Sequence, residues 1–206
     1  MKVSAIILSG GRAMRMGGED KGLLLLQNKP LIQHVIERLK PQVDEILINA
    51  NREIAQYQML AYPILQDENA DFIGPLAGFS LGLQHAKHEY VLTVPCDSPL
   101  LPLNLAERLL RGMSEACADI AVASSDDDVH PVFCLCKKSV LPSLTDYLTS
   151  GEHKVSTWQK FQKYVEVDFS DNPDAFINLN TFDDLVALEL KLGHGTHCNT
   201  MNAKQA

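Results

Sequence analysis

Residues 3–22 read VSAIILSGGRAMRMGGEDKG, and this stretch decides the fold. Its first six residues form a largely apolar, β-branched run, which is typical of a strand covered on both faces of a sheet. Glycines, Arg12, Arg15 and Lys21 follow at once. Glycine lets a backbone approach a ligand closely, successive backbone N–H groups form a concave anion site, and basic side chains supply charge for a polyphosphate. The stretch predicts a strand that leads into a nucleoside-triphosphate loop.

The loop matches neither of the two common phosphate-binding fingerprints. A Walker A loop requires G-x-x-x-x-G-K-[ST], but Gly22 follows Lys21 here and the glycine spacing differs. The dinucleotide fingerprint G-x-G-x-x-G is also absent. The missing Walker motif disfavours a GTP-hydrolysing switch, so another class of nucleotide-binding protein is indicated.

Composition favours a small-molecule enzyme over a nucleic-acid or membrane protein. The chain has 206 residues and a net charge of −8, which would repel nucleic acid. Residues 1–40 nevertheless carry a net charge of +4. The sequence contains no apolar run of membrane-spanning length, and its five cysteines include no C-x-x-C pair. We expect a cytoplasmic protein that concentrates positive charge around a small phosphorylated ligand.

Apolar runs and helical periodicities alternate along the chain. Strands are predicted at residues 3–8, 45–49, 63–65, 90–95, 119–124, 130–136 and 164–168, the sixth of them antiparallel. Helices are predicted at residues 30–39, 75–86, 103–117, 139–149, 155–161 and 182–192, with Pro30 at the first helical position. The alternation predicts a Rossmann-like, three-layer α/β/α fold with a mostly parallel sheet. Residues 1–192 are expected to form one domain, and residues 193–206 a flexible tail.

Polar side chains follow three of the predicted strands. Asn49, Asp67 and Asp97 lie at or just after strand ends, where open α/β sheets bind ligands. A carboxylate at such an edge suits Mg²⁺, which is commonly held by one or two carboxylates together with substrate phosphates. We therefore expect Asp97 to bind Mg²⁺, although it could instead cap the following helix. Asp67 could accept hydrogen bonds from a base or a ribose, or simply form a turn.

The first loop resembles the opening of the nucleotidyltransferases, roughly L-A-G-G-x-(S/A)-x-R-M-G-x-(D)-K. The elements of this pattern occur in order, with Ser9 in place of the usual alanine. Further segments resemble the molybdenum cofactor guanylyltransferases, a family that joins GMP to molybdopterin. These segments are KGL at 21–23, NANR at 49–52, Asp67, GPLAG at 74–78, PCDSP at 95–99 and NLNT at 178–181. The resemblance covers about residues 3–190.

The resemblance implies a role for each matching residue. Arg15, Lys21 and Asp97 are expected to be catalytic, because Arg15 and Lys21 would neutralise charge at the α-phosphate and the leaving pyrophosphate. The residues expected to bind the nucleotide are Leu8, Ser9, Gly10, Gly11, Lys21, Asn49, Asp67 and Asp97. Lys154, Asn178 and Asn180 are expected to contact the pterin substrate. From the residues alone, Thr181 could equally make the 178–181 segment a helix cap.

The expected reaction is attack by the terminal phosphate of molybdopterin on the α-phosphate of GTP, assisted by Mg²⁺, with release of pyrophosphate. The expected partners are GTP, molybdopterin or its molybdenum-loaded form, and other proteins of cofactor biosynthesis. One alternative is a transferase for another base or acceptor, such as a molybdopterin cytidylyltransferase or a sugar-phosphate nucleotidyltransferase. An alternative from another class is a non-catalytic nucleotide-binding sensor. The residues themselves argue for nucleotidyl transfer, and the guanylyl assignment comes from the resemblance.

Overall fold

The computed structural model describes residues 1–9, 20–67, 74–126, 128–172, 174–179 and 181–195. Most of the predicted site residues fall within these ranges. Four of them, Gly10, Gly11, Arg15 and Asn180, lie outside the described residues.

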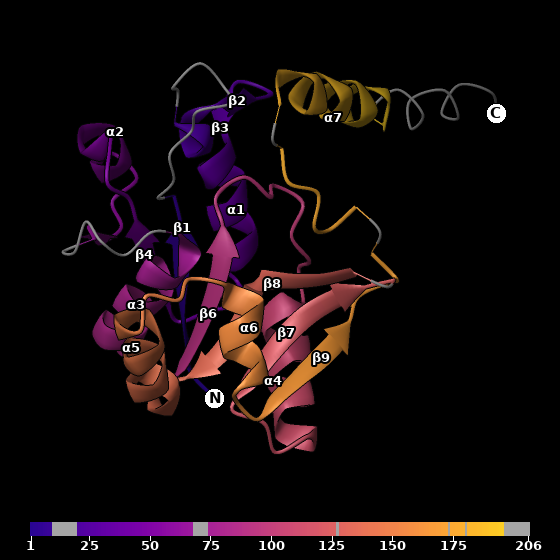
Figure 1. Cartoon of the computed structure of the whole chain (residues 1–206). Coiled ribbons are helices and arrows are strands. Elements are labelled where there is room, and N and C mark those ends of the chain that lie inside the picture. Colours follow the sequence, from indigo (N-terminus) through magenta and orange to yellow (C-terminus); the bar gives the residue numbers. More distant parts are fainter. Residues whose placement is uncertain (10–19, 68–73, 127, 173, 180, 196–206) are drawn as a thin grey trace.

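Within these residues a seven-stranded sheet occupies the centre, in the order β5-β4-β1-β6-β8-β7-β9 (Figure 1). The strands are β1 (Val3–Leu8), β4 (Glu45–Asn49), β5 (Ile64–Leu65), β6 (Tyr90–Pro95), β7 (Ile120–Ser125), β8 (Asp128–Lys137) and β9 (Tyr164–Asp168). Pairing is parallel except where β8 meets β6 and β7. The predicted mostly parallel sheet with one antiparallel strand is confirmed.

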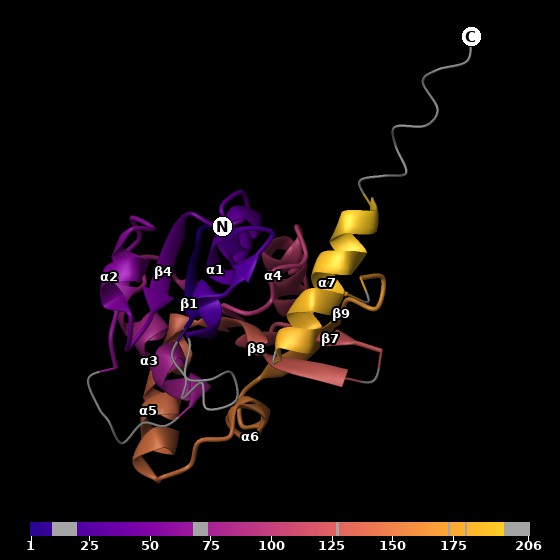
Figure 2. The same cartoon turned by 90° about the horizontal axis from the view of Figure 1, so that it is seen from above.

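Helices cover both faces of the sheet (Figure 2). One face packs against α1 (Leu31–Leu39), α2 (Ile54–Gln58) and α4 (Leu105–Glu115), and the other against α3 (Pro75–His85), α5 (Leu141–Thr149) and α6 (Val155–Lys160). Side chains alternate along a strand, so β1 directs Ala5 and Ile7 into the first core and Ile6 and Leu8 into the second. The three-layer architecture predicted from the sequence is confirmed.

A hairpin and the last helix add a third, smaller core. Strands β2 (Leu25–Leu26) and β3 (Lys29–Pro30) pair across Gln27 and Asn28, whose φ angles of 50° and 61° suit a tight hairpin turn. The last helix, α7 (Phe182–Gly195), packs on this region through its leucines. Among the described helices, none is long and apolar enough to cross a membrane.

The structure shifts several of the predicted boundaries and adds one short helix. Pro30 is not the first residue of a helix, because it pairs with Leu25 in β3, and α1 begins at Leu31. Helix α7 continues to Gly195, past the predicted end at residue 192. Helix α2 was not predicted, because five residues are too few to show a clear helical periodicity.

Candidate active site

The carboxyl ends of four neighbouring strands meet at one edge of the sheet. Leu8 at the end of β1 is in register with Asn49 at the end of β4 and with Pro95 at the end of β6, and Asn49 is in register with Leu65. The N–H of Ser9, which is buried, donates to the Asn49 carbonyl at 2.8 Å. Residues that follow different strands are therefore held side by side, as expected for a ligand-binding edge of an open α/β sheet.

Lys21 and Asp97 form an ion pair at this edge. Lys21 belongs to the short 3₁₀ helix η1 (Lys21–Leu23), and its Nζ lies 3.2 Å from Oδ2 of Asp97, just after β6. The side chains are 27% and 12% exposed, so both are shielded from solvent yet reachable by a ligand. The pair places a cation suited to phosphate beside a carboxylate suited to a metal ion.

Asp97 does not cap the following helix. Helix α4 begins only at Leu105, and its N-cap residue, Asn104, makes no side-chain capping bond. Instead, the Asp97 carbonyl accepts a hydrogen bond from the N–H of Leu179 at 3.1 Å. The buried Ser98 donates its hydroxyl hydrogen bond to Oδ1 of Asn178 at 2.6 Å. The structure thus brings Asn178 to the Asp97 loop, as expected of a site residue.

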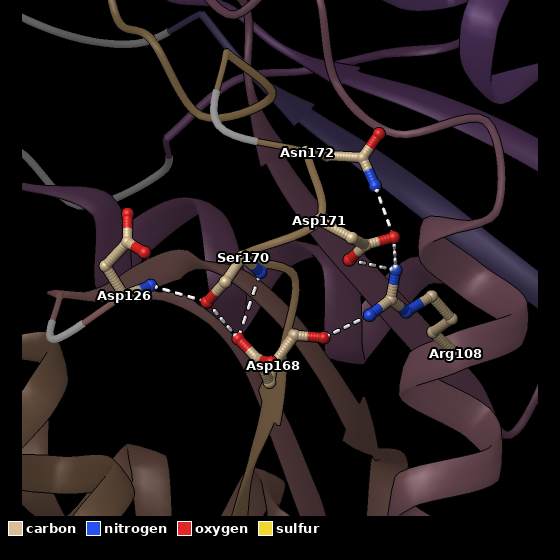
Figure 3. A network of polar contacts seen from close by, with 6 residues as sticks. All are labelled: Arg108, Asp126, Asp168, Ser170, Asp171 and Asn172. Atoms are coloured by element: carbon tan, nitrogen blue, oxygen red, sulfur yellow. Dashed lines mark hydrogen bonds and ion pairs between the residues drawn. The ribbon is translucent and has the colours of Figure 1, made fainter.

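Arg108 anchors the segment that delivers Asn178, a role that the sequence did not reveal. From α4, its guanidinium pairs with both oxygens of Asp171 at 2.8 and 2.9 Å and donates to the Asp168 carbonyl (Figure 3). The same group lies 4.1 Å from the ring centroid of Phe169, which packs edge-on against Phe176. A planar guanidinium can donate from Nη1 to Asp171 and from Nη2 to the Asp168 carbonyl while it lies over an aromatic ring, and this combination favours arginine over lysine. These contacts fix the chain between β9 and the site.

Asp67 is held by Asn49, the last residue of β4, and by Asn51, which follows the strand. Its Oδ1 accepts from Nδ2 of Asn49 at 2.9 Å, and its Oδ2 accepts from Nδ2 of Asn51 at 2.6 Å. Asn51 in turn accepts from the N–H of Asp67 at 2.8 Å. A carboxylate has about four lone-pair sites, so the half-buried Asp67 can still accept from a ligand. The predicted Asn49 and Asp67 are therefore brought together, and Asn51 joins them.

The chain is similar to known proteins over most of its length. A model of the family described as "MobA-like NTP transferase domain" matches residues 5–167. The chain belongs to this family. The MobA-like transferase is 46% identical over 184 residues to a molybdenum cofactor guanylyltransferase of Shewanella putrefaciens, covering 89% of this chain and 94% of that one. It is 50% identical over 194 residues to the same-named protein of Polynucleobacter asymbioticus, covering 92% and 97%.

A solved structure shares the fold of this MobA-like transferase. It is titled molybdopterin-guanine dinucleotide biosynthesis protein A from Archaeoglobus fulgidus. The two superpose with a TM-score of 0.77 at 21% identity, covering 93% of this chain and 99% of that one. The predicted family and Rossmann-like fold are confirmed, and the chain is a nucleotidyltransferase enzyme.

Cys96 stands next to Asp97 in the MobA-like transferase but is not suited to act as a nucleophile. Its side chain is buried, and burial raises the pKa of the thiol well above its ordinary value, with the charge of Asp97 adding to the effect. A thiol with a raised pKa stays protonated near neutral pH, and the thiolate is the reactive form. Cys96 therefore fills space beneath the site.

Gly22 is the η1 residue that no larger side chain can replace without a shift of its neighbours. A Cβ at this position would lie 2.6 Å from Oη of Tyr57 and 3.3 Å from both Cβ and Sγ of Cys96. We expect Gly22→Ala to lower the free energy of unfolding by about 1–3 kcal/mol through overpacking, measured by urea denaturation. Leu25→Ala, at an exposed position of β2, is the control. An unchanged urea midpoint for Gly22→Ala would contradict this packing.

Lys154 is an exposed residue at the N-cap of α6, and the hydroxyl of Tyr147 donates to its carbonyl at 3.2 Å. Its contact with the pterin substrate stays a prediction.

Thr181 forms a helix cap. Its Oγ1 accepts from the N–H of Asp184 at 3.1 Å, and its own N–H donates to Oδ2 of Asp184 at 2.8 Å. This reciprocal capping box starts α7, so the 178–181 segment combines capping with the Asn178 contact.

Proposed function

We propose that this enzyme transfers GMP from GTP to the terminal phosphate of molybdopterin, or of its molybdenum-loaded form, and releases pyrophosphate. The observation that carries the proposal is the Lys21–Asp97 pair at the carboxyl edge of the sheet, in a chain whose close relatives bear the name molybdenum cofactor guanylyltransferase. Those names also favour a guanylyl transferase over the cytidylyl and sugar-phosphate alternatives and over a non-catalytic sensor.

Asp97 is the residue that would hold Mg²⁺. Its carboxylate is a hard oxygen donor at a strand end, and one of its oxygens faces the Lys21 ammonium. Among the described residues, no three His, Cys, Asp or Glu side chains gather into a metal-binding group. This suits Mg²⁺, which commonly takes one or two carboxylates and completes its shell with water and substrate phosphates. When bound, the ion would neutralise charge on the phosphates.

Lys21 would act on the phosphates themselves. In transfer of a phosphoryl or nucleotidyl group, the protein mainly positions the reactants and stabilises the charge that builds on the phosphate oxygens. The Lys21 ammonium would bind the α-phosphate and the leaving pyrophosphate, assisted by Arg15 and by the backbone N–H groups of Gly10 and Gly11. The phosphate of the acceptor would attack in line. The protonated thiol of Cys96 agrees with a reaction without a covalent enzyme intermediate.

The nucleoside would lie toward the Asn49–Asp67 side of the edge. Leu8 ends β1 and Ser9 follows it, so both lie between Asp67 and Asp97. Asp67 retains acceptor capacity for N–H or O–H groups of guanine or ribose. The pterin would then lie toward Asn178, Asn180 and Lys154. The cytoplasm, where GTP is available, would be the compartment of the reaction, and delivery of the pterin by another biosynthetic protein belongs to the same proposal.

The proposal is tested with purified protein, Mg²⁺, molybdopterin and each of the four nucleoside triphosphates, measuring pyrophosphate release. We expect release with GTP at least about tenfold above that with CTP, because a loss of roughly 1.4 kcal/mol in differential binding already produces this ratio. Omitting molybdopterin controls for hydrolysis, and a sugar phosphate replaces it in a parallel reaction. Preference for CTP or for the sugar phosphate would support the corresponding alternative, and GTP binding without turnover would support a sensor.

A further inference from the structure

Tyr57 is a buried polar residue beneath the candidate site that the proposed mechanism does not yet use. It lies on α2, is completely inaccessible to solvent, and packs within the core formed by β1, α1 and β4. Its hydroxyl donates to Oδ1 of Asp20 at 2.5 Å. Burial raises the pKa of the Tyr57 hydroxyl, and the neighbouring Cys96 and Asp20 add to the effect. The hydroxyl therefore stays protonated and able to donate.

Asp20 links the Tyr57 hydroxyl to the residues of η1, which follow Asp20 in the chain. Its Oδ1 also accepts from the N–H of Gly22 at 3.1 Å, which makes Asp20 the N-cap of η1. The Asp20 carbonyl accepts from the N–H of Leu23 at 3.0 Å. A 3₁₀ helix of three residues has little stability of its own, so its position depends on such anchors.

Lys21 is the η1 residue whose position matters for the reaction. Its backbone lies between Asp20, which carries the carboxylate, and Gly22, whose N–H donates to Oδ1 of that carboxylate. The Tyr57 hydroxyl donates to the same oxygen. The Lys21 ammonium reaches Asp97 at 3.2 Å from this support. A displacement of η1 by about 1 Å would move the ammonium relative to the reacting phosphates, and misplacements of this size cost catalysis about a hundredfold.

The chain segment that carries Tyr57 also supports the other half of the site. It begins with Asn49 and Asn51, which hold Asp67, and enters α2 through Glu53. Glu53 has φ 49° and ψ 32°, a left-handed conformation that non-glycine residues rarely adopt outside constrained sites. The β4–α2 segment therefore contacts both the nucleoside side and the phosphate side of the edge.

We propose that Tyr57 is a positioning residue, whose hydroxyl acts through Asp20 to hold η1 so that Lys21 faces the phosphates beside Asp97. The consequence for turnover rests on the proposed function. A Tyr57 hydroxyl that only stabilised the fold would lower the melting temperature without changing the kinetic constants of the folded enzyme. A positioning role changes kcat of the folded enzyme.

Tyr57→Phe removes the hydroxyl and keeps the ring. We expect kcat for GMP transfer to fall about ten- to hundredfold, since hydrogen bonds to charged groups are worth this much when converted to a rate. The KM for molybdopterin should stay within about twofold, because the acceptor does not contact η1 in the proposed arrangement. Tyr62→Phe is the matched control. Tyr62 packs against the same core, and its hydroxyl makes no hydrogen bond with the part of the chain that the structure describes.

A double-mutant cycle with Lys21→Met decides whether Tyr57 acts through Lys21. When one residue acts through another, the effects of their substitutions on the rate do not add. Tyr57→Phe should therefore change the residual rate of Lys21→Met by less than about twofold. The same fold loss in both backgrounds would overturn the proposal, as would a kcat for Tyr57→Phe within twofold of the wild-type value. Should Tyr57→Phe fail to fold, Asp20→Ala removes the same link from outside the apolar core and should show the same cycle with Lys21→Met.

Failure of the proposed function can be distinguished from failure of the Tyr57 proposal, because in the first case the unmodified enzyme transfers no GMP. In that case the cycle is carried out on the dissociation constant of GTP with Mg²⁺, measured by calorimetry. We then expect Tyr57→Phe to raise the dissociation constant of GTP in the wild-type background and to leave it unchanged in the Lys21→Met background. Equal binding by wild type and Tyr57→Phe would overturn it.

Discussion

Asp97→Asn should lower the rate of pyrophosphate release about 10²–10³-fold while the fold is preserved. The amide keeps the size of the side chain but lacks the negative charge that would hold Mg²⁺ and that pairs with Lys21 at 3.2 Å. Because the ion would then be held by the substrate phosphates and neutral ligands alone, the Mg²⁺ concentration that gives half-maximal rate should also rise. Both quantities are read from a Mg²⁺ titration of pyrophosphate release.

The matched control for this variant is Asp119→Asn. Asp119 also forms an ion pair, with Lys137 at 2.7 Å, but it precedes β7 and so lies at the opposite edge of the sheet. Its replacement should leave the rate within about twofold, because the pair lies away from the candidate site and partly exposed ion pairs contribute little. Equal activity of Asp97→Asn and the control would show that Asp97 is not part of the site. A large fall in the melting temperature of Asp97→Asn would show that Asp97 has a structural role instead.

Lys21→Met is expected to lower the rate about 10²–10³-fold as well, for a different reason. The thioether side chain fills similar space without the ammonium that would stabilise negative charge on the α-phosphate and the leaving pyrophosphate. The loss should therefore appear mainly in kcat, and the Mg²⁺ concentration for half-maximal rate should stay near the wild-type value. Single-turnover measurements with radiolabelled GTP give the rate of the transfer step directly.

Lys137→Met provides the control for the lysine, because it removes an ammonium of similar exposure from the other edge of the sheet. A kcat for Lys21→Met close to that of this control would show that Lys21 serves only as the partner of Asp97. A parallel rise in the Mg²⁺ requirement would show that the two residues form a joint cation site. The two variants thus assign the ammonium and the carboxylate separate tasks.

Much of the site could be predicted because parallel strands bring their carboxyl ends to one edge. Asn49, Asp67 and Asp97 each follow an apolar run, so the order of elements alone places them near each other. Asn178 comes from the far end of the chain, and its position was indicated by resemblance to a family. Its contact with Ser98 could not be inferred from local sequence, because the two residues are separated by 80 positions.

Tyr57 and Arg108, which support the site, could not be predicted from the sequence, and the physical reason is the same for both. Tyr57 contacts Asp20 across 37 positions from a helix of five residues, and Arg108 on α4 reaches Asp171 across 63 positions. Neither residue stands in a motif, and neither lies at a strand end. Their roles arise from packing distances that periodicity does not encode. The roles of a buried tyrosine and of an arginine with several partners can be recognised only once those partners are in place.

The sequence by itself determined the fold class, the parallel strand ends, the glycine-rich first loop and the resemblance to a family, because these depend on local patterns of apolar, glycine and charged residues. Only the tertiary structure decided that Lys21 meets Asp97, that Asn51 joins Asn49 in holding Asp67, and that Tyr57 supports η1 through Asp20. These contacts depend on how strands and helices pack, and that arrangement is set by the whole core rather than by any one segment.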